Sequence, residues 1–562
     1  MSFTTWFEDE LPGTGILKAY YEDYDNWNGG IYYLGIDFEK EYKGKIIVAT
    51  VNNRLTKLDT KITRSCNVDF FDVYSLYGSR TYMRGLYFLF VKAVKDVLNA
   101  DVKLMCFIER GIYCEVLTNN LISEVTVEKI KIRMRELVES AIPITKIMVS
   151  RLDAIDYFFK VNQHDKANSL RFISNSTISL NKLDDTLDYF YGVLPCNTSY
   201  LSNFNAKYLK DNKIMLLAPV TFKPDEKIKF NKCDKVLEAV ERQIKYLQSI
   251  GINTTVELNC NIANGEYGDI IRMSETFQND KLLDIVDKVT KDKDIKMILL
   301  TGPSSSGKTT TSKKLALFFK MKGYKPIPIS VDNFYTDMKD RVLDENGKPE
   351  IERIEAFDTN QFNKKISELL NGKEVILPRY NFIEGKQEFD EKNKIKLEDK
   401  SILIVEGIHA FNEKLTEIIP SKNKFKVFVS PLTPLNVDNH NLFKSTDNRL
   451  LRRIVRDNRT RGASASDTLK MWKKVREIEE EMIFPYMKEA DEILNTSLVY
   501  ELGVLKTYAE PLLFSVSEDD PNYDEALRLI NLFRVILGIP SEEVPNDSII
   551  REFIDGSCFK DL

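Results

Sequence analysis

The chain has 562 residues, 43% of them hydrophobic and 29% charged, with a formal net charge of -5 at pH 7. This length exceeds one ordinary hydrophobic core, so about two to four domains are expected in a soluble globular protein. The near-balanced charge gives no electrostatic indication of a nucleic-acid-binding surface.

The cysteines and the apolar runs bear on the cellular location. The seven cysteines are odd in number and are never spaced as CxxC, which favours reduced thiols in a cytoplasmic protein. Residues 1–13 are acidic and lack a basic region followed by an apolar run, so no secretory signal is expected. The strongest apolar run, residues 86–91, is far shorter than the roughly 20 residues that span a bilayer. No membrane segment is expected.

The first half of the chain is predicted to hold a small β-rich domain followed by an α+β domain. Short β-rich runs alternate with polar turns between residues 44 and 82. Helical patterns at 86–98 and 127–141 then alternate with strand patterns up to about residue 223. Polar amphipathic helices at 231–249 and 279–293 lead into the next domain.

From residue 296 the sequence changes to apolar strands separated by helices, which predicts a mostly parallel, doubly wound α/β sheet. The candidate strands are residues 297–302, 325–332, 401–409 and 424–432. Polar insertions at 337–350 and 381–394 are predicted to be loops over the strand ends, where α/β enzymes bind ligands. We therefore expect four parts: 1–82 (extension and β-rich domain), 83–270 (α+β), 271–500 (α/β) and 501–562 (helical).

Residues 302–309, GPSSSGKT, fit the phosphate-binding pattern GxxxxGK[ST] directly between a strand and an amphipathic helix. The glycines let successive N–H groups and the helix N-terminus face a nucleotide phosphate. Lys308 is predicted to neutralise the β- and γ-phosphate oxygens, and Thr309 to offer a hydroxyl to Mg²⁺. The predicted ATP-binding residues are Gly302, Ser304, Ser305, Ser306, Gly307, Lys308, Thr309 and Thr310.

A GTPase is the first alternative, because NKCD (231–234) and NKLD (181–184) fit the guanine-binding pattern and DENG (344–347) fits DxxG. In GTPases these motifs adjoin apolar strands, whereas the segments that precede NKCD and DENG here are polar. We interpret both as chance matches.

A kinase needs an acid near the acceptor hydroxyl and a second acid for Mg²⁺. Asp332 ends the strand after the phosphate-loop helix, so its carboxylate is expected at the same sheet edge as the phosphates, where it could take the hydroxyl proton. A turn or helix N-cap is the alternative role for this residue. Glu406 ends another strand and suits Mg²⁺, held directly or through water.

An arginine-rich helix follows, in TDNRLLRRIVRDNRTRG (446–462). Its spacing places several guanidinium groups on neighbouring helix faces, so a lid could direct them at one phosphate chain. The alternatives are a solvated basic face or a nucleic-acid-binding patch. The arginines are Arg449, Arg452, Arg453, Arg456, Arg459 and Arg461.

The motifs GPSSSGKTT, SVDNFY, PRYNF, IVEGIH and TDNRLLRRIVRDNRTRG resemble, in order and spacing, the uridine kinase and phosphoribulokinase superfamily over about residues 295–500. The resemblance implies transfer of the ATP γ-phosphoryl group to a ribose 5′-hydroxyl, with Asp332 as catalytic base and Thr309 and Glu406 as Mg²⁺ ligands. It also implies substrate contacts at Tyr335, Glu352, Tyr380 and Arg453 and a lid formed by Arg449, Arg452 and Arg456.

The sequence departs from uridine kinases where those enzymes have a histidine a few residues after the tyrosine. Here Tyr380 is followed by NFIEG, with Gly385 at the corresponding position. A pocket without a specific polar partner discriminates poorly between substrates, so uracil recognition does not follow from the resemblance.

The front half resembles two parts of threonyl-tRNA synthetases. VNNRLTKLDTKI (51–62) and the residues after it resemble the ubiquitin-like TGS domain, and residues 154–170 resemble the second additional domain. With the tail, which resembles that of longer bacterial uridine kinase homologues, the likeness covers about residues 44–530. The helix that would carry the synthetase HxxxH pair reads RGLYFLFVKAV, without histidine, so editing or zinc chemistry is not supported.

The three histidines, His164, His409 and His440, share no metal-ligand spacing, and we expect each to be structural. The first hypothesis is an ATP- and Mg²⁺-dependent kinase acting on a uridine- or cytidine-like nucleoside. The alternatives are a kinase of another small sugar or alcohol, as in phosphoribulokinase, and an RNA-associated regulatory protein that binds ATP. Homo-oligomerisation is compatible with each hypothesis.

Overall fold

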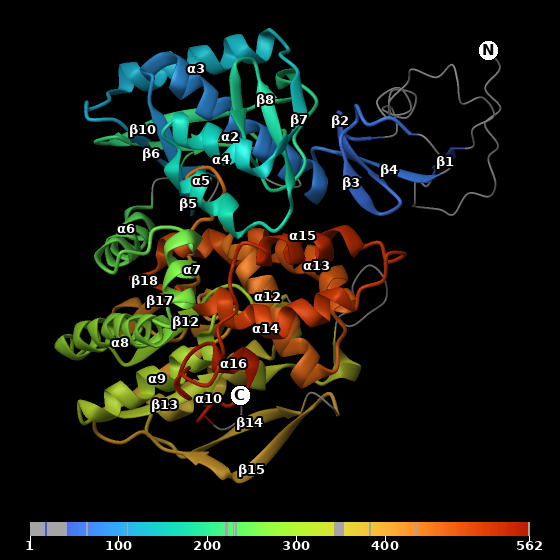
Figure 1. Cartoon of the computed structure of the whole chain (residues 1–562). Coiled ribbons are helices and arrows are strands. Elements are labelled where there is room, and N and C mark those ends of the chain that lie inside the picture. Colours follow the sequence, from blue (N-terminus) through green and yellow to red (C-terminus); the bar gives the residue numbers. More distant parts are fainter. Residues whose placement is uncertain are drawn as a thin grey trace.

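The structure is a computed structural model that describes residues 17–19, 42–62, 66–108, 111–219, 223–228, 230, 233–341, 353–381, 384–432 and 435–559. The predicted ribose-binding residue Glu352 lies outside these ranges, as do the DENG motif and half of NKCD. Figure 1 shows the first half of the chain at the top and the α/β domain with the C-terminal helices below it.

The first structural unit is an antiparallel sheet in the order β1-β4-β2-β3. Helix α2 (Leu76–Leu98) follows and packs on β2 and β4; its first turn is capped by the Ser75 hydroxyl, which accepts the Gly78 N–H. The sequence predicted strand-like structure up to residue 82, but the cap starts a helix earlier, so the predicted domain boundary falls inside α2. The strands are β1 Leu17–Ala19, β2 Ile46–Val51, β3 Arg54–Thr56 and β4 Cys66–Asp72.

An α+β unit follows, with one sheet in the order β10-β11-β6-β5 and a second in the order β7-β8-β9. Helices α2 and α3 (Glu124–Glu139) pack on each other and share one apolar core with strands of all three sheets of the first half. The strands are β5 Asp101–Ile108, β6 Gly111–Leu117, β7 Ile144–Ser150, β8 Thr177–Leu183, β9 Thr186–Asp188, β10 Asn205–Lys210 and β11 Lys213–Leu217; the short helices are α4 Arg151–Lys160 and α5 His164–Ser169.

The α/β domain contains a fully parallel five-stranded sheet in the order β13-β16-β12-β17-β18. Alternate residues of β12 face two different cores: Ile298 packs with helices α8 and α9, and Leu299 packs with α6 and α10 on the other face. The predicted doubly wound sheet is therefore confirmed. The strands are β12 Met297–Thr301, β13 Lys325–Ser330, β16 Ser401–Glu406, β17 Lys424–Ser430 and β18 Glu492–Asn495; the helices are α6 Asp234–Ser249, α8 Tyr267–Lys291, α9 Lys308–Met321 and α10 Thr359–Leu370. The predicted boundary at residue 270 falls inside α8.

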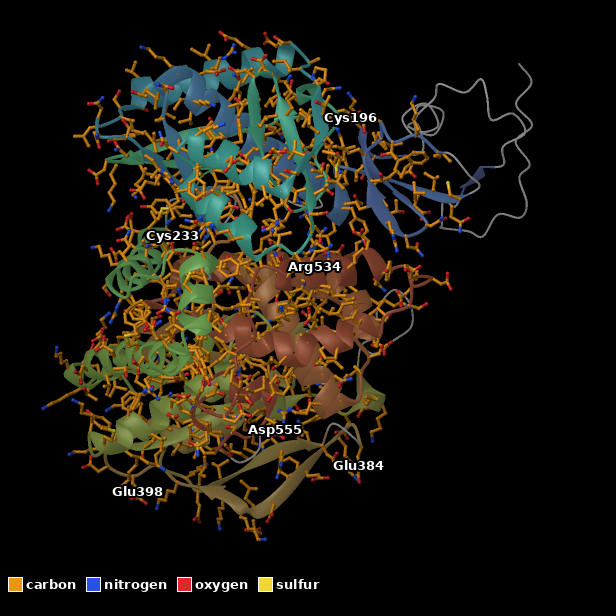
Figure 2. The ribbon with its side chains drawn as sticks, in the orientation of Figure 1. Cys196, Cys233, Glu384, Glu398, Arg534 and Asp555 are labelled. Carbon is orange, nitrogen blue, oxygen red and sulfur yellow. The ribbon has the colours of Figure 1, made fainter. Side chains whose placement is uncertain are left out.

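A β-hairpin extends below this domain in Figure 1, formed by β14 (Val375–Asn381) and β15 (Lys386–Ile395). Glu384, in its turn, and Glu398, just after β15, mark its two ends in Figure 2. The sequence analysis predicted residues 381–394 to be a loop, and that prediction is wrong. Both faces of a hairpin at the edge of the molecule can be exposed, so its strands can be polar throughout. The alternating apolar pattern that indicates a strand is therefore absent from this segment.

The remaining helices form a bundle around one apolar core beside the sheet. Their bounds are α7 Thr255–Ala263, α12 Ser445–Arg461, α13 Ala465–Met482, α14 Glu501–Phe514, α15 Tyr523–Phe533 and α16 Arg551–Ile554; α11 Glu413–Thr416 lies on the sheet side. The predicted boundary at residue 500 falls at the start of α14. Among the described helices, none combines the length and the hydropathy of a membrane span. All seven cysteines are described and none is joined in a disulfide; Cys196 and Cys233 are labelled in Figure 2.

Candidate active site at the carboxyl ends of the parallel strands

The phosphate loop joins β12 to α9 through two glycines that no other residue could replace without strain. Gly302 has φ 154°, and a Cβ atom there would lie 2.0 Å from the carbonyl oxygen of Val429. Gly307 caps α9 with φ 87°, a left-handed conformation that favours glycine. The backbone therefore curls so that the N-terminus of α9 opens onto the sheet edge, as an anion-binding loop requires.

The loop carries polar groups that lack partners. The hydroxyl groups of Ser305 and Ser306 are buried, and among the described residues neither has a hydrogen-bond partner. The Lys308 ammonium is folded back onto the loop and donates to the carbonyl oxygens of Gly302 and Pro303, both at 3.0 Å. Buried polar groups normally find partners, so these hydroxyls and this cation fit a bound phosphate chain.

Two carboxylates meet beside Lys308. The strand ends that carry them are adjacent, because Ser330 pairs with Glu406 between β13 and β16 and Asp332 follows Ser330 by two residues. Burial and the neighbouring Asp332 carboxylate raise the pKa of Glu406 to about 7, while Lys308 opposes this shift. Burial also raises the pKa of Asp332, again against the charge of Lys308.

The same electrostatic coupling acts on the lysine. Burial lowers the pKa of Lys308, and the carboxylates of Glu406 and Asp332 oppose this change. Two carboxylates crowded at one sheet edge, next to the partly buried Thr309, form an oxygen donor set of the kind that Mg²⁺ prefers. The residues present thus fit a magnesium-bound nucleotide.

Arg449 and Arg452, on α12, reach the phosphate loop but are already paired. Arg449 donates to Glu479 at 2.8 Å and to the Ser304 carbonyl at 3.1 Å. Arg452 donates to Glu501 at 2.8 Å and to the Ser305 carbonyl at 3.3 Å. Both side chains are almost fully buried. In this structure the two arginines hold the loop through hydrogen bonds to its backbone carbonyls. Their predicted place in a mobile lid stays a prediction.

Three arginines further along α12 are arranged around Asp457. Arg453 donates to the Ser304 hydroxyl at 3.0 Å and to Asp457, and Arg456 donates to Asp457 at 2.7 and 2.8 Å. Arg461 lies 3.6 Å from Asp457 with 56% of its side chain exposed. The charges of Arg461 and Arg456 also act on Asp332. This end of α12 therefore lies near the sheet edge that carries Asp332.

The predicted nucleoside-binding tyrosines form a buried aromatic cluster. The rings of Tyr335 and Tyr380 are 5.4 Å apart, and Phe357 stacks on Tyr335 at 4.2 Å. The Arg341 guanidinium lies over both tyrosine rings, at 4.6 and 5.2 Å, and donates to the Tyr380 hydroxyl at 2.6 Å. His409 packs edge-on against Phe357 at 5.6 Å. The sequence analysis did not identify Arg341, because it belongs to no motif.

Two carboxylates that the sequence analysis missed also contact the loop. Glu479, on α13, accepts the Ser304 N–H at 3.0 Å in addition to its pair with Arg449. Glu552, on α16, accepts the N–H and the hydroxyl of Thr310 at 3.2 and 2.7 Å. Neither position carries a local sequence signal, because both contacts depend on how distant helices pack.

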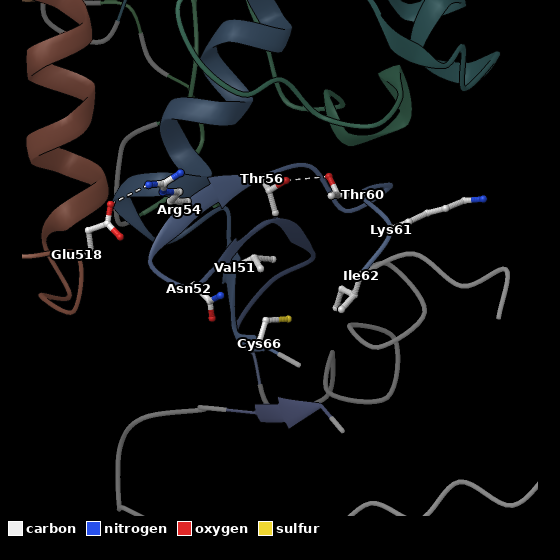
Figure 3. A pocket seen from close by; sticks show the side chains of 9 residues that line it. All are labelled: Val51, Asn52, Arg54, Thr56, Thr60, Lys61, Ile62, Cys66 and Glu518. Atoms are coloured by element: carbon white, nitrogen blue, oxygen red, sulfur yellow. Dashed lines mark hydrogen bonds and ion pairs between the residues drawn. The ribbon is translucent and has the colours of Figure 1, made fainter. Parts of the chain in front are cut away.

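Other candidate positions lie away from this site. His440 contacts Asp101 at 2.9 Å and Asp188 at 2.7 Å, which links the loop before α12 to the α+β unit. A separate cavity of about 360 Å³ lies in the first β unit, beside Arg54 and Glu518, which form an ion pair of 3.0 Å (Figure 3). It contains none of the predicted site residues. Among the described residues, no three metal-ligating side chains form a cluster that could hold an ion.

Comparison with known proteins bears on the same part of the chain. The family model described as "Phosphoribulokinase / Uridine kinase family" matches residues 297–500. This segment is a domain of that family. The "Uridine kinase" of Ligilactobacillus salivarius is 29% identical over 199 residues, which is 35% of this chain and 84% of that enzyme.

Two further similarities cover the same region. The "Uridine kinase" of Staphylococcus epidermidis is 28% identical over 200 residues, 35% of this chain and 86% of that enzyme. A solved structure described as a possible uridine kinase from Bacillus stearothermophilus covers 39% of this chain and 98% of its own, with 16% identity and a TM-score of 0.27. The predicted synthetase-like domains of the front half stay a prediction.

Proposed function

We propose that the protein is an ATP- and Mg²⁺-dependent phosphotransferase that phosphorylates a hydroxyl group of a small molecule, with a uridine- or cytidine-like nucleoside as the first candidate. The observation that carries the proposal is the meeting of Lys308, Asp332 and Glu406 at one sheet edge, where both carboxylates raise the pKa of Lys308 and Lys308 lowers the pKa of each carboxylate. The family domain at residues 297–500 and the related uridine kinases support it.

Each residue has a defined part in this proposal. The loop N–H groups and the hydroxyls of Ser305 and Ser306 hold the phosphate chain, and Lys308 turns from the loop carbonyls to its oxygens. Thr309 and Glu406 would hold Mg²⁺, which supplies charge neutralisation between the phosphates. The raised pKa of Asp332 suits a group that accepts a proton from the acceptor hydroxyl.

The exposed end of α12 completes the site. Arg456 and Arg461 lie where their charges reach Asp332, so they would stabilise the negative charge of the transferred phosphoryl group and help to exclude water. Neither arginine is fully buried. Asp457 is buried but also accepts from Arg453 at 3.2 Å, so both arginines can turn from Asp457 to a phosphate without leaving this carboxylate unpaired.

The test is a screen of ATP consumption against nucleosides and phosphorylated sugars, with the product identified by mass spectrometry. We expect a phosphorylated product with uridine or cytidine from the wild-type chain and none from Lys308→Ala. If no acceptor of either class stimulates ATP consumption, the proposed phosphotransferase activity is wrong.

One observation favours a second candidate, a kinase of an acceptor that carries its own negative charge, such as a sugar phosphate. Arg341 is 8% exposed, lies between the two tyrosines, and forms no ion pair with a carboxylate among the described residues. A buried, unbalanced cation is costly unless a ligand supplies the counter-charge. Gly385, in place of the histidine of uridine kinases, is consistent with such a change of acceptor.

The variant Arg341→Gln separates the two candidates. For an anionic acceptor we expect the KM for that acceptor to rise about 10- to 100-fold while the KM for ATP is unchanged, because a charge-assisted bond is lost. For a neutral nucleoside the acceptor KM should change by less than about threefold. Lys339→Gln, two residues away on the exposed surface, is the matched control.

A further inference from the structure

The start of helix α9 is contacted by an anionic side chain from the far end of the chain. Glu552 accepts both the backbone N–H of Thr310, at 3.2 Å, and its hydroxyl, at 2.7 Å. These donors belong to the first turn of the helix that follows the phosphate loop, where nucleotide phosphates bind in proteins with this motif. The Glu552 side chain is buried, and its charge also acts on Lys308.

Several contacts hold the surrounding segment, residues 547–555, in this place. Lys314, on α9, lies 3.1 Å from Asp547, and the Ser548 hydroxyl donates to Glu275 at 2.6 Å. Ile549 packs directly on Gly307 of the loop, since a Cβ atom on that glycine would lie 2.6 Å from its Cγ2. The segment is therefore docked on the phosphate loop by charge, hydrogen bonds and apolar contact together.

The arginine helix holds the segment from the other side. Arg459 donates to Asp555 at 2.9 Å and to the carbonyl oxygen of Glu552 at 3.0 Å. The Phe553 ring lies under the guanidinium of Arg452, 5.2 Å from it. Asp555 is labelled in Figure 2 in the lower part of the molecule, at the α/β domain. Residues 547–555 thus connect the phosphate loop to the helix whose arginines face the acceptor side.

A nucleotide phosphate and the Glu552 carboxylate cannot share the Thr310 donors. Both are anions, and two like charges at hydrogen-bonding distance from the same N–H group repel strongly in a buried site. Glu406 and Asp332 already bring negative charge to Lys308, and Glu552 adds a third carboxylate whose charge raises the pKa of Glu406 further. Binding of a nucleotide must therefore displace the Glu552 side chain.

We propose that Glu552 is an autoinhibitory residue: its carboxylate occupies a phosphate position of the nucleotide site and competes with ATP for Thr310. The inference rests on the proposed nucleotide site, and it adds a regulatory contact that lowers ATP affinity until the carboxylate turns away. Because Arg459 holds both Asp555 and the Glu552 carbonyl, the position of α12 and the release of Glu552 are coupled.

The test measures binding of ATP with Mg²⁺ to the full chain by calorimetry, in the wild type, Glu552→Ala and Glu552→Gln. We expect ATP to bind both variants about tenfold more tightly than the wild type, since each removes a competing charged hydrogen bond. Glu552→Gln keeps the side-chain volume, so it serves where Glu552→Ala unfolds. Glu542→Ala, an exposed carboxylate in the preceding turn, is the control and should bind like the wild type.

The outcomes separate this inference from the proposed function. Unchanged or weaker ATP binding in both Glu552 variants, with measurable binding in the wild type, overturns the autoinhibitory role and leaves Glu552 as a fixed cap of α9. Absence of ATP binding in all four proteins overturns the nucleotide site itself, and the inference with it. A thermal unfolding curve of each nucleotide-free protein shows whether the variants are folded.

Discussion

The phosphate loop and the arginine helix α12 both bring buried cations to the same sheet edge, but the two regions differ in how the charge is balanced. Among the described residues, Lys308 donates to backbone carbonyls of its own loop and forms an ion pair with none of the nearby carboxylates. Arg449 and Arg452 are each joined to a buried carboxylate, Glu479 and Glu501. The unpaired cation is available to a ligand, whereas the paired cations stabilise the loop.

The largest expected effect is the loss of activity when the phosphate loop or the neighbouring strand end is changed. Lys308→Ala should abolish phosphoryl transfer, and Asp332→Asn should lower kcat by about 10² to 10⁴, the usual cost of losing a positioned base. Asp332→Asn should not lower the melting temperature, because it removes one of two crowded carboxylates, whereas Lys308→Ala should lower it, because it removes the cation that offsets them. Steady-state kinetics and thermal unfolding of both variants check this. Full activity of Asp332→Asn would remove that residue from the reaction.

Changes to the arginines of α12 that are paired with buried carboxylates are expected to lower the stability of the fold. Arg452→Met leaves Glu501 buried without a counter-charge, so the free energy of unfolding should fall by about 3 to 5 kcal/mol. Arg456→Gln, on the same helix, leaves the buried Asp457 paired with Arg453, so it should cost less, about 1 to 2 kcal/mol, while lowering kcat. Denaturant unfolding distinguishes them. The double variant Arg452→Met with Glu501→Leu is the control, and should recover much of the lost stability.

The strand, phosphate loop and helix at residues 297–321 could be predicted from the sequence because the residues that specify them are close together in the chain. The pattern of residues 302–309, the apolar strand before it and the helix after it lie within 25 residues of chain. Asp332 and Glu406 were predicted at the same edge because each ends a strand of the predicted parallel sheet. Sequence reasoning also predicted the parallel sheet correctly.

The partners of Arg449, Arg452 and Thr310 could not be predicted from the sequence. Arg449 meets Glu479 across 30 residues, Arg452 meets Glu501 across 49, and Thr310 meets Glu552 across 242. Each pairing depends on how distant helices pack, and no fixed sequence spacing indicates which side chains such packing brings together. Arg341 was missed for the same reason, and the hairpin β14–β15 because its polar strands lack an apolar face.

A smaller effect is expected from the crowded carboxylates. The pKa of Glu406 is raised to about 7 from 4.5, so the native state keeps a proton that the unfolded state loses. This group therefore destabilises the nucleotide-free protein progressively as pH rises from about 4.5 to 7, and by roughly 3 to 4 kcal/mol above pH 7.

The variant Glu406→Gln tests this account of the site's charge. It should raise the melting temperature of the nucleotide-free protein at pH 8, leave it unchanged near pH 4.5, and weaken the dependence of activity on Mg²⁺ concentration or abolish activity. A melting temperature at pH 8 equal to or below that of the wild type would show that Glu406 is not held under electrostatic strain. Glu413→Gln, a partly exposed carboxylate paired with Lys424 and Lys426, is the matched control and should lower stability at pH 8 slightly.

The central claim is that Lys308, Asp332 and Glu406 converge on one phosphate chain. A crystal structure with Mg²⁺ and a non-hydrolysable ATP analogue tests it most directly. The account predicts the Lys308 ammonium moved from the Gly302 carbonyl to the β- and γ-phosphate oxygens, Glu406 facing the metal, and the Asp332 carboxylate facing the terminal phosphate. A nucleotide bound away from residues 302–310, or an Asp332 side chain directed away from the terminal phosphate, would contradict it.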